Sequence, residues 1–281
     1  MHITADGRPV VVTGGAAGIG LAVAEALAAD GHPLGIVDLD AGAAQTAARA
    51  LADRHGIRAA GAGADVADEA ASAAAHADLV AALGGPVLVL VNNAGIMPPR
   101  RDRAEALPVS DFDRMLAVHL RGSLIWSRLV LPGMRAAGFG RIVNLGSVLG
   151  LVAAAHRIGY VTAKSAMTGI TRALALEGAR AGITVNAVAP GFVLTGNLIE
   201  RAQTGVLDHD AIADHTPVGR WARPDEIAHA IRFLADPASG YITGTVLPVD
   251  GGYAIRGHPG EDIGPRPPAP NFLSPAAGAP A

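Results

Sequence analysis

Short apolar stretches alternate along this chain with longer alanine-rich stretches. The apolar stretches are nearly continuous and rich in β-branched residues, as in parallel strands buried on both faces. They comprise Val10–Val12, Leu34–Val37, Val87–Val91, Arg141–Leu145, Ile183–Val188 and Thr245–Val249. The longer stretches have the length of helices and comprise Ile19–Ala29, Ala41–His55, Glu69–Leu83, Asp111–Leu131, Val161–Ala181 and Asp225–Ala235. Because strands and helices alternate, the pattern predicts an α/β fold, a doubly wound parallel sheet flanked by helices on both faces.

The composition of the chain changes after Gly252. Residues 253–281 contain 7 of the 19 prolines and no stretch that predicts a strand or helix. We therefore expect one catalytic domain over residues 1–252 and a proline-rich C-terminal extension over residues 253–281. Such a composition is typical of a disordered tail. The alternative is an extended arm that packs on a neighbouring subunit.

Composition and charge exclude several classes of protein. Half of the 281 residues are hydrophobic and 17% are charged, so a folded core is expected. The net charge of −3 offers no basic surplus for nucleic acid or an anionic membrane. The absence of cysteine excludes disulfides, thiolate metal sites and cysteine nucleophiles, and we expect no metal. No apolar stretch of about 18 residues predicts a membrane span, so a cytoplasmic protein is expected.

The segment Thr13–Gly20 follows a strand and opens a helix, and it is rich in glycine. Small residues allow the backbone to approach a pyrophosphate, and a helix N-terminus supplies free N–H groups. This turn therefore predicts a dinucleotide site on a Rossmann-like sheet. Its contributing residues are Gly14, Gly18, Ile19 and Gly20.

Asp38 ends the second predicted strand and is followed by Leu39. It lies near the spacing expected for a carboxylate that accepts hydrogen bonds from the adenosine ribose. A 2′-phosphate there would meet a like charge, and no Arg or Lys lies in the turn or directly after Asp38 to receive one. The sequence thus favours NAD over NADP. The alternative is that Asp38 only caps the next helix.

Lys164 is the only lysine, beside 21 arginines, and it lies four residues after Tyr160. On a helix these two side chains share a face. Since a nearby ammonium favours a phenolate, the pair is suited to proton transfer. Ser147 follows the strand Arg141–Leu145, where its hydroxyl can hold a substrate oxygen beside the tyrosine.

The chain resembles the short-chain dehydrogenase/reductase family, in its compact single-domain branch. The matching motifs are Thr13–Gly20, Asn92–Gly95, Ser147, Tyr160 with Lys164, and Pro190–Gly191, in the family's order and spacing. The resemblance implies that Tyr160 is the general acid/base, that Ser147 positions the carbonyl or alcohol, and that Lys164 binds the nicotinamide ribose and lowers the pKa of Tyr160. It further implies cofactor contacts by Asp65, Val66, Asn92, Ala94, Gly95, Pro190, Gly191, Val193 and Thr195.

One position departs from the family pattern. His119 stands where the family usually has an asparagine that completes a proton relay to the lysine. An imidazole can donate and accept a proton and titrates near neutrality, so it can replace the amide and add pH dependence. The alternative is a histidine that only packs or caps.

The resemblance also places the substrate pocket. It implies lining by Val148, Leu149, His156 and Phe192, with a lid from Gly196–His215. His156 either reaches a substrate hydroxyl or is simply solvated. We expect an NAD-dependent oxidoreductase that interconverts a secondary alcohol, such as a polyol, sugar or hydroxy compound, and its ketone. Alternatives are a 3-oxoacyl-type ketoreductase or a non-catalytic dinucleotide-binding sensor or scaffold. The helices Asp111–Leu131 and Val161–Ala181 resemble those that pair between subunits in this family, which implies a homotetramer.

Overall fold

The computed structural model describes residues 7–98, 100–257 and 264, and most of the proline-rich extension lies outside them. The expected arm or tail at residues 253–281 is thus described only at its start, where a single 3-10 turn covers Tyr253–Ile255. None of the described helices is both long and apolar enough to cross a membrane.

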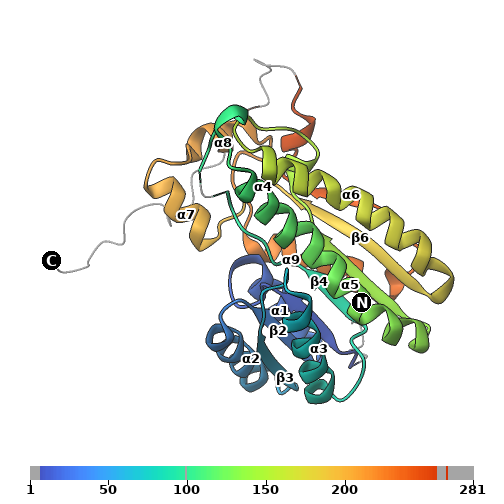
Figure 1. Ribbon diagram of the computed structural model, residues 1–281. Coiled ribbons are helices and arrows are strands. Elements are labelled where there is room, and N and C mark those ends of the chain that lie inside the picture. Colours follow the sequence, from blue (N-terminus) through green and yellow to red (C-terminus); the bar gives the residue numbers. More distant parts are fainter. Residues whose placement is uncertain (1–6, 99, 258–263, 265–281) are drawn as a thin grey trace, which may run out of the picture.

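The described strands form a seven-stranded parallel sheet in the order β3-β2-β1-β4-β5-β6-β7 (Figure 1). The strands are β1 (Val10–Thr13), β2 (Leu34–Asp38), β3 (Ala59–Gly63), β4 (Val89–Asn92), β5 (Gly140–Leu145), β6 (Ile183–Pro190) and β7 (Val246–Val249). The expected doubly wound parallel sheet is therefore confirmed.

Helices cover both faces of this sheet and bury an apolar core on each. One core joins the strands to α1, α2 and α9, and the other joins them to α3, α5 and α6. The helices are α1 (Gly18–Ala29), α2 (Ala41–His55), α3 (Glu69–Leu83), α4 (Val109–Leu116), α5 (Gly122–Ala137), α6 (Ile158–Gly178), α7 (Gly196–Gln203), α8 (His209–His215) and α9 (Pro224–Ala235).

The strand order reverses between β1 and β4, which lie side by side with Thr13 opposite Asn92. The loops that leave these two strands run to opposite sides of the sheet and open a crevice at the carboxyl ends. Ligands of open α/β sheets bind at such a switch point. The fold therefore places the glycine-rich turn after β1 and the Asn92–Gly95 segment after β4 at one site.

Two features of the fold were not expected from the pattern. The edge strand β3 consists of alanine and glycine, because α2 lies directly over it: a Cβ on Gly61 would lie 2.4 Å from the carbonyl carbon of Ala44. The helix expected over Asp111–Leu131 instead runs from Val109 to Ala137 and is interrupted by a π-helical turn at Ala117–Arg121. Such single turns often lie at functional sites, and this one carries His119.

Candidate active site

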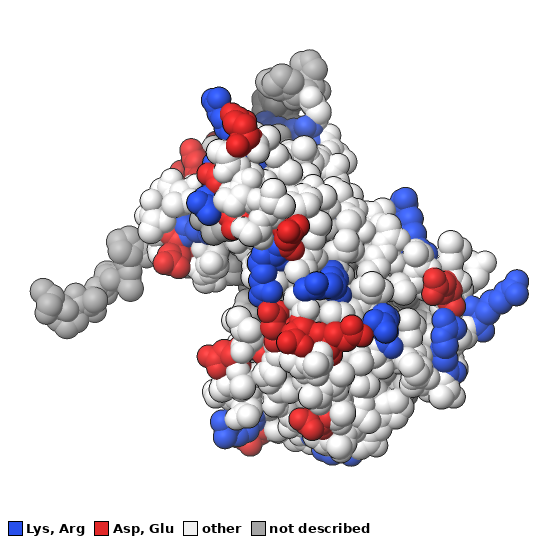
Figure 2. Space-filling model, viewed as in Figure 1, with Lys and Arg blue, Asp and Glu red and all other residues white. Residues whose placement is uncertain are grey.

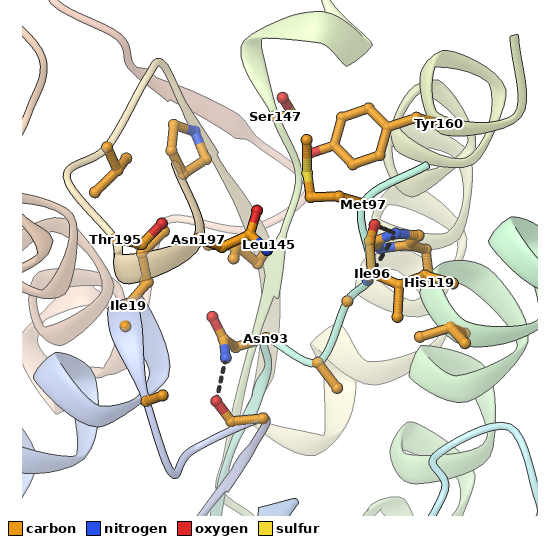
Figure 3. A pocket seen from close by; sticks show the side chains of 18 of the residues that line it. Ile19, Asn93, Ile96, Met97, His119, Leu145, Ser147, Tyr160, Thr195 and Asn197 are labelled. Carbon is orange, nitrogen blue, oxygen red and sulfur yellow. Dashed lines mark hydrogen bonds between the residues drawn. The ribbon is translucent and has the colours of Figure 1, made fainter. Parts of the chain in front are cut away.

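A cleft of about 740 Å³ opens at the carboxyl ends of the strands. Figure 3 shows Ile19 and Thr195 on one side of it and Tyr160 and His119 on the other. Most of the expected site residues line this cleft, namely Gly14, Gly18, Ile19, Asp38, Leu39, Asp65, Val66, Ala94, Gly95, His119, Ser147, Tyr160, Lys164, Pro190, Gly191, Val193 and Thr195.

The glycine-rich turn has the shape that a pyrophosphate requires. Gly14 and Gly18 have φ of +61° and +55°, which favours glycine. No side chain caps the N-terminus of α1, so its first N–H groups remain free for an anion. Gly20 does not line the cleft, but a Cβ there would lie 2.1 Å from the carbonyl oxygen of Gly14, so it allows α1 to pack against the turn. These residues fit a dinucleotide.

The two asparagines at the end of β4, Asn92 and Asn93, have different hydrogen-bond partners. Asn92, expected to contact the cofactor, is buried, and its Nδ2 donates to Oδ1 of Asn144 on β5 at 2.9 Å. Asn93 instead lines the cleft, and its Nδ2 donates to the carbonyl oxygens of Thr13 and Gly14 at 2.9 and 2.8 Å (Figure 3). The expectation for Asn92 is thus corrected, since its side chain joins two strands. Because strand residues alternate in direction, the residue that ends β4 faces the core and its neighbour does not.

Asp38 lies at the carboxyl end of β2 and accepts a hydrogen bond from the amide of Ala16 in the glycine-rich turn at 3.2 Å. The N-cap of α2 is Asp40, whose Oδ1 accepts from the amide of Ala43. The alternative that Asp38 caps the next helix is therefore wrong, and its carboxylate faces the cleft.

The polar residues expected to do chemistry meet at one wall of the cleft. Ser147, directly after β5, and Tyr160, on the first turn of α6, both line this wall. Lys164 lies one turn further along α6, with its Nζ 5.8 Å from the centroid of the Tyr160 ring, and donates to the carbonyl oxygen of Leu145 at 2.6 Å. The helical spacing of Tyr160 and Lys164 brings both to the cleft, as the sequence predicts.

Comparisons with known proteins agree with this arrangement. The family described as enoyl-(acyl carrier protein) reductase matches residues 14–254. D-threitol dehydrogenase of Mycolicibacterium smegmatis is 42% identical over 252 residues, which are 89% of this chain and 94% of that protein. Cis-4-hydroxycyclohexanecarboxylate dehydrogenase of Sinomonas cyclohexanicum is 43% identical over 246 residues, 88% of this chain and 96% of that protein. The crystal structure of levodione reductase matches with a TM-score of 0.82 at 31% identity, covering 88% of this chain and 98% of that one.

The chain belongs to the short-chain dehydrogenase/reductase family. It is an enzyme whose named relatives are dehydrogenases that act on CH–OH groups. Dehydrogenases of the short-chain dehydrogenase/reductase family use a nicotinamide cofactor, NAD or NADP. The described residues contain no group of three or more His, Asp or Glu side chains arranged to hold a metal ion.

In this short-chain dehydrogenase/reductase, burial controls the ionisation of the catalytic candidates. Burial raises the pKa of Tyr160 above its usual value, against the opposing effects of the Ser147 hydroxyl and the charge of Arg157. Burial also lowers the pKa of Lys164 to about 7. The expected lowering of the Tyr160 pKa by Lys164 does not appear, because desolvation disfavours both charged forms.

His119 is buried on the π-helical turn and contacts Tyr160 edge to face, with ring centroids 5.5 Å apart. Its Nε2 lies 2.9 Å from the carbonyl oxygen of Ile96. Burial, and to a lesser extent the charge of Lys164, lowers the pKa of His119 to about 3. The imidazole is therefore neutral at physiological pH, which corrects the expectation that it titrates near neutrality.

Four residues expected to bind substrate lie outside this cleft. Val148 and Leu149 are buried in a 3-10 turn, and His156 is exposed with φ of +62°, which is unusual for a residue other than glycine. Phe192 packs against Trp221 and Tyr253, with centroids 5.5 and 5.6 Å away. The segment expected as a lid forms α7 and α8, and α7 contributes Leu198 and Arg201 to the cleft.

Proposed function

We propose that this enzyme uses NAD to interconvert a secondary alcohol and its ketone. The observation that carries the proposal is the meeting of Ser147, Tyr160 and Lys164 at one wall of a cleft whose other end is formed by the glycine-rich turn and Asp38. When bound, NAD takes the hydride from the carbinol carbon in oxidation and returns it in reduction. The chain's own residues hold the reactants and move the proton.

Each residue of this group has a distinct task in the proposal. The Tyr160 hydroxyl oxygen accepts the alcohol proton during oxidation and donates it during reduction. The Ser147 hydroxyl donates a hydrogen bond to the substrate oxygen and keeps it beside Tyr160, since both side chains line the same cleft. The Lys164 ammonium binds the nicotinamide ribose.

The residues that would hold the cofactor extend from this wall to the other end of the cleft. In the proposal Asp38 and Leu39 hold the adenosine ribose, Asp65 and Val66 flank the adenine, and the uncapped start of α1 holds the pyrophosphate. Arg114 fixes Asp65 through an ion pair of 2.9 Å. The remaining contacts come from Gly14, Gly18, Ile19, Asn93, Ala94, Gly95, Pro190, Gly191, Val193 and Thr195.

The carboxylate of Asp38 should select NAD. Because a 2′-phosphate would meet this like charge, kcat/KM with NAD should exceed that with NADP by at least about 100-fold. Asp38→Asn should narrow this ratio by about 10-fold or more, whereas Asp53→Asn, an exposed carboxylate on α2, should leave it as it is. Initial rates with both cofactors measure the ratio, and an NADP preference of the unaltered enzyme would contradict the role of Asp38.

The neutral imidazole of His119 should support Tyr160 by packing. His119→Asn removes the ring that contacts Tyr160, so we expect kcat/KM to fall about 2- to 10-fold. Because His119 stays neutral above about pH 3, the variant should keep the same ionisations in its pH–rate profile between about pH 5 and pH 8. An ionisation in that window that disappears with the histidine would instead assign it to a proton relay.

The substrate class follows from a screen of purified enzyme. NADH absorbance is followed with alcohols, polyols, sugars and hydroxy acids. A 3-oxoacyl thioester is tested in the reductive direction, since a relative that is 34% identical is named a 3-oxoacyl-[acyl-carrier-protein] reductase. Turnover of a secondary alcohol supports the proposal. NAD binding without turnover of any substrate would favour a sensor or scaffold.

We further propose that residues 1–252 act as one catalytic domain and that the protein is a cytoplasmic homotetramer paired through α4, α5 and α6. Leu124 on α5 and Leu176 on α6 are 41% and 83% exposed, which supports a contact between subunits on these helices. Light scattering measures the assembly.

A further inference from the structure

Arg157 is the N-cap residue of α6 and lies three residues before Tyr160. It is 8% exposed, yet its side chain has no hydrogen bond or ion pair with any residue that the structure describes. Arginine keeps its proton at every pH at which the protein is folded. A buried cation of this kind is unfavourable unless an anion compensates it.

Several other arginines of the chain pair with carboxylates. Figure 2 shows acidic and basic side chains lying together in a band across the face in view. Arg128 of α5 pairs with Glu69 of α3 at 3.0 Å. Arg220 and Arg232 are less buried than Arg157, and they too have carboxylate partners within 2.7 Å. Arg141 is 4% exposed and also lacks a carboxylate, but its guanidinium donates to the carbonyl oxygens of Gly140, Gly182, Asp236 and Pro237. Among the described residues, Arg157 is thus the buried arginine with neither kind of partner.

The charges of two further arginines act on Arg157. After burial, the charge of Arg101 is the largest influence that lowers the Arg157 pKa, and Arg201 of α7 acts in the same direction. No carboxylate among the described residues contributes, and Tyr160 and Tyr253 stabilise the charge only as phenolates. Arg201 lines the same cleft as Ser147 and Tyr160. The positive charge of Arg201 therefore lies at the cleft, and Arg157 adds its charge three residues before the proposed general acid/base.

The pyrophosphate of a cofactor bound at the glycine-rich turn is not the anion that would compensate Arg157. The turn lies at the end of the cleft formed by β1 and α1, whereas Arg157 begins α6, which carries Tyr160. Arg157 is close enough to Tyr160 for its charge to lower the Tyr160 pKa, so an anion held by Arg157 lies near the atom that exchanges its proton with Tyr160. The planar guanidinium matches a carboxylate with two parallel hydrogen bonds.

We propose that Arg157, assisted by Arg101 and Arg201, binds a carboxylate of the substrate, so that the enzyme acts on a hydroxy acid and its keto acid rather than on a neutral polyol. The inference rests on the proposed alcohol–ketone chemistry and adds the substrate class. The carboxylate compensates the buried charge and orients the carbinol carbon, while Ser147 and Tyr160 engage the hydroxyl.

Matched pairs of alcohols test this proposal. Initial rates are measured for cyclohexanol against hydroxycyclohexanecarboxylate, and for 2-butanol against 3-hydroxybutyrate, with NAD and the full-length enzyme. In each pair the carboxylate partner should have the higher kcat/KM. Arg157→Met should lower the carboxylate-to-neutral ratio on the order of 10- to 100-fold, chiefly through KM. Arg157→Lys should restore part of it, and Arg201→Met should lower it less.

Arg49→Met serves as the matched control, because Arg49 is exposed on α2 and should leave the ratio unchanged. Arg201→Met keeps the test valid if loss of the buried Arg157 impairs folding, since Arg201 is only partly buried. The inference is overturned if the carboxylate-to-neutral ratio of kcat/KM is near one in the unaltered enzyme. It is also overturned if neither Arg157→Met nor Arg201→Met changes this ratio. Both results leave the proposed alcohol chemistry intact. A rise in the KM for NAD without a change in the ratio would also overturn the inference, by assigning the arginines to the cofactor.

Binding measured without turnover separates the proposed carboxylate site from the proposed alcohol–ketone reaction. Calorimetry compares cyclohexanecarboxylate with cyclohexylmethanol in the unaltered enzyme, Arg157→Met and Arg49→Met. Binding of the carboxylate alone, lost in Arg157→Met, supports the anion site even if no alcohol is oxidised, in which case only the proposed reaction fails. Equal binding of both compounds overturns the anion site.

Discussion

Tyr160→Phe should lower the rate of hydride transfer at least about 100-fold, because it removes the proposed general acid/base. The ring would remain, with its edge contact to His119, so the fold and the cleft should be preserved. What disappears is the hydroxyl that exchanges the proton in the proposal. Single-turnover measurement of NADH formation reports the step directly, and the affinity for NAD should change far less than the rate.

Tyr241→Phe is the matched control, since this tyrosine is fully exposed outside the cleft. It should retain the rate of the unaltered enzyme and its thermal stability. Near-normal turnover in Tyr160→Phe would refute the assignment. A loss of rate accompanied by a large fall in melting temperature would point to unfolding instead, and the control variant separates these outcomes.

The strands of the sheet interior were predictable because continuous β-branched stretches allow few other structures. The edge strand β3 was missed because α2 packs so close to it that Gly61 cannot carry a side chain, and alanine and glycine give no strand signal. Likewise, the π-helical turn around His119 depends on how α4 and α5 pack, which their amphipathic pattern does not contain.

Some features of the proposed site could also be predicted from the sequence, whereas others depend on the folded chain. The pairing of Tyr160 with Lys164 follows from helical periodicity, and the turn at Gly14 follows from its position between strand and helix. Arg157 could not be singled out among 21 arginines, because what distinguishes it is burial without a partner, a property of the folded chain. The neutral state of His119 likewise follows from its burial and from Lys164, not from its place in the sequence.

Lys164→Arg should lower kcat/KM on the order of 100-fold although it keeps the charge. Lys164 is 5% exposed, and its Nζ reaches the carbonyl oxygen of Leu145 at 2.6 Å beside the Tyr160 ring. A broad planar guanidinium cannot occupy this narrow space with the same geometry, so it should displace the ribose or Tyr160. Arg172→Lys, the reverse exchange at an exposed position of the same helix, is the control and should retain the rate of the unaltered enzyme.

The pH dependence of NAD affinity gives Lys164→Arg a second, independent readout. Burial lowers the pKa of Lys164 to about 7, whereas ribose binding requires the ammonium. The affinity for NAD should therefore be greatest below about pH 7 and should fall as the pH rises above it, with one proton taken up on binding. In Lys164→Arg the guanidinium stays protonated, so its weaker affinity should not depend on pH between about pH 7 and pH 9. Calorimetry in two buffers of different ionisation enthalpy counts the proton. Wild-type kinetics in Lys164→Arg would contradict the role proposed for the Lys164 ammonium.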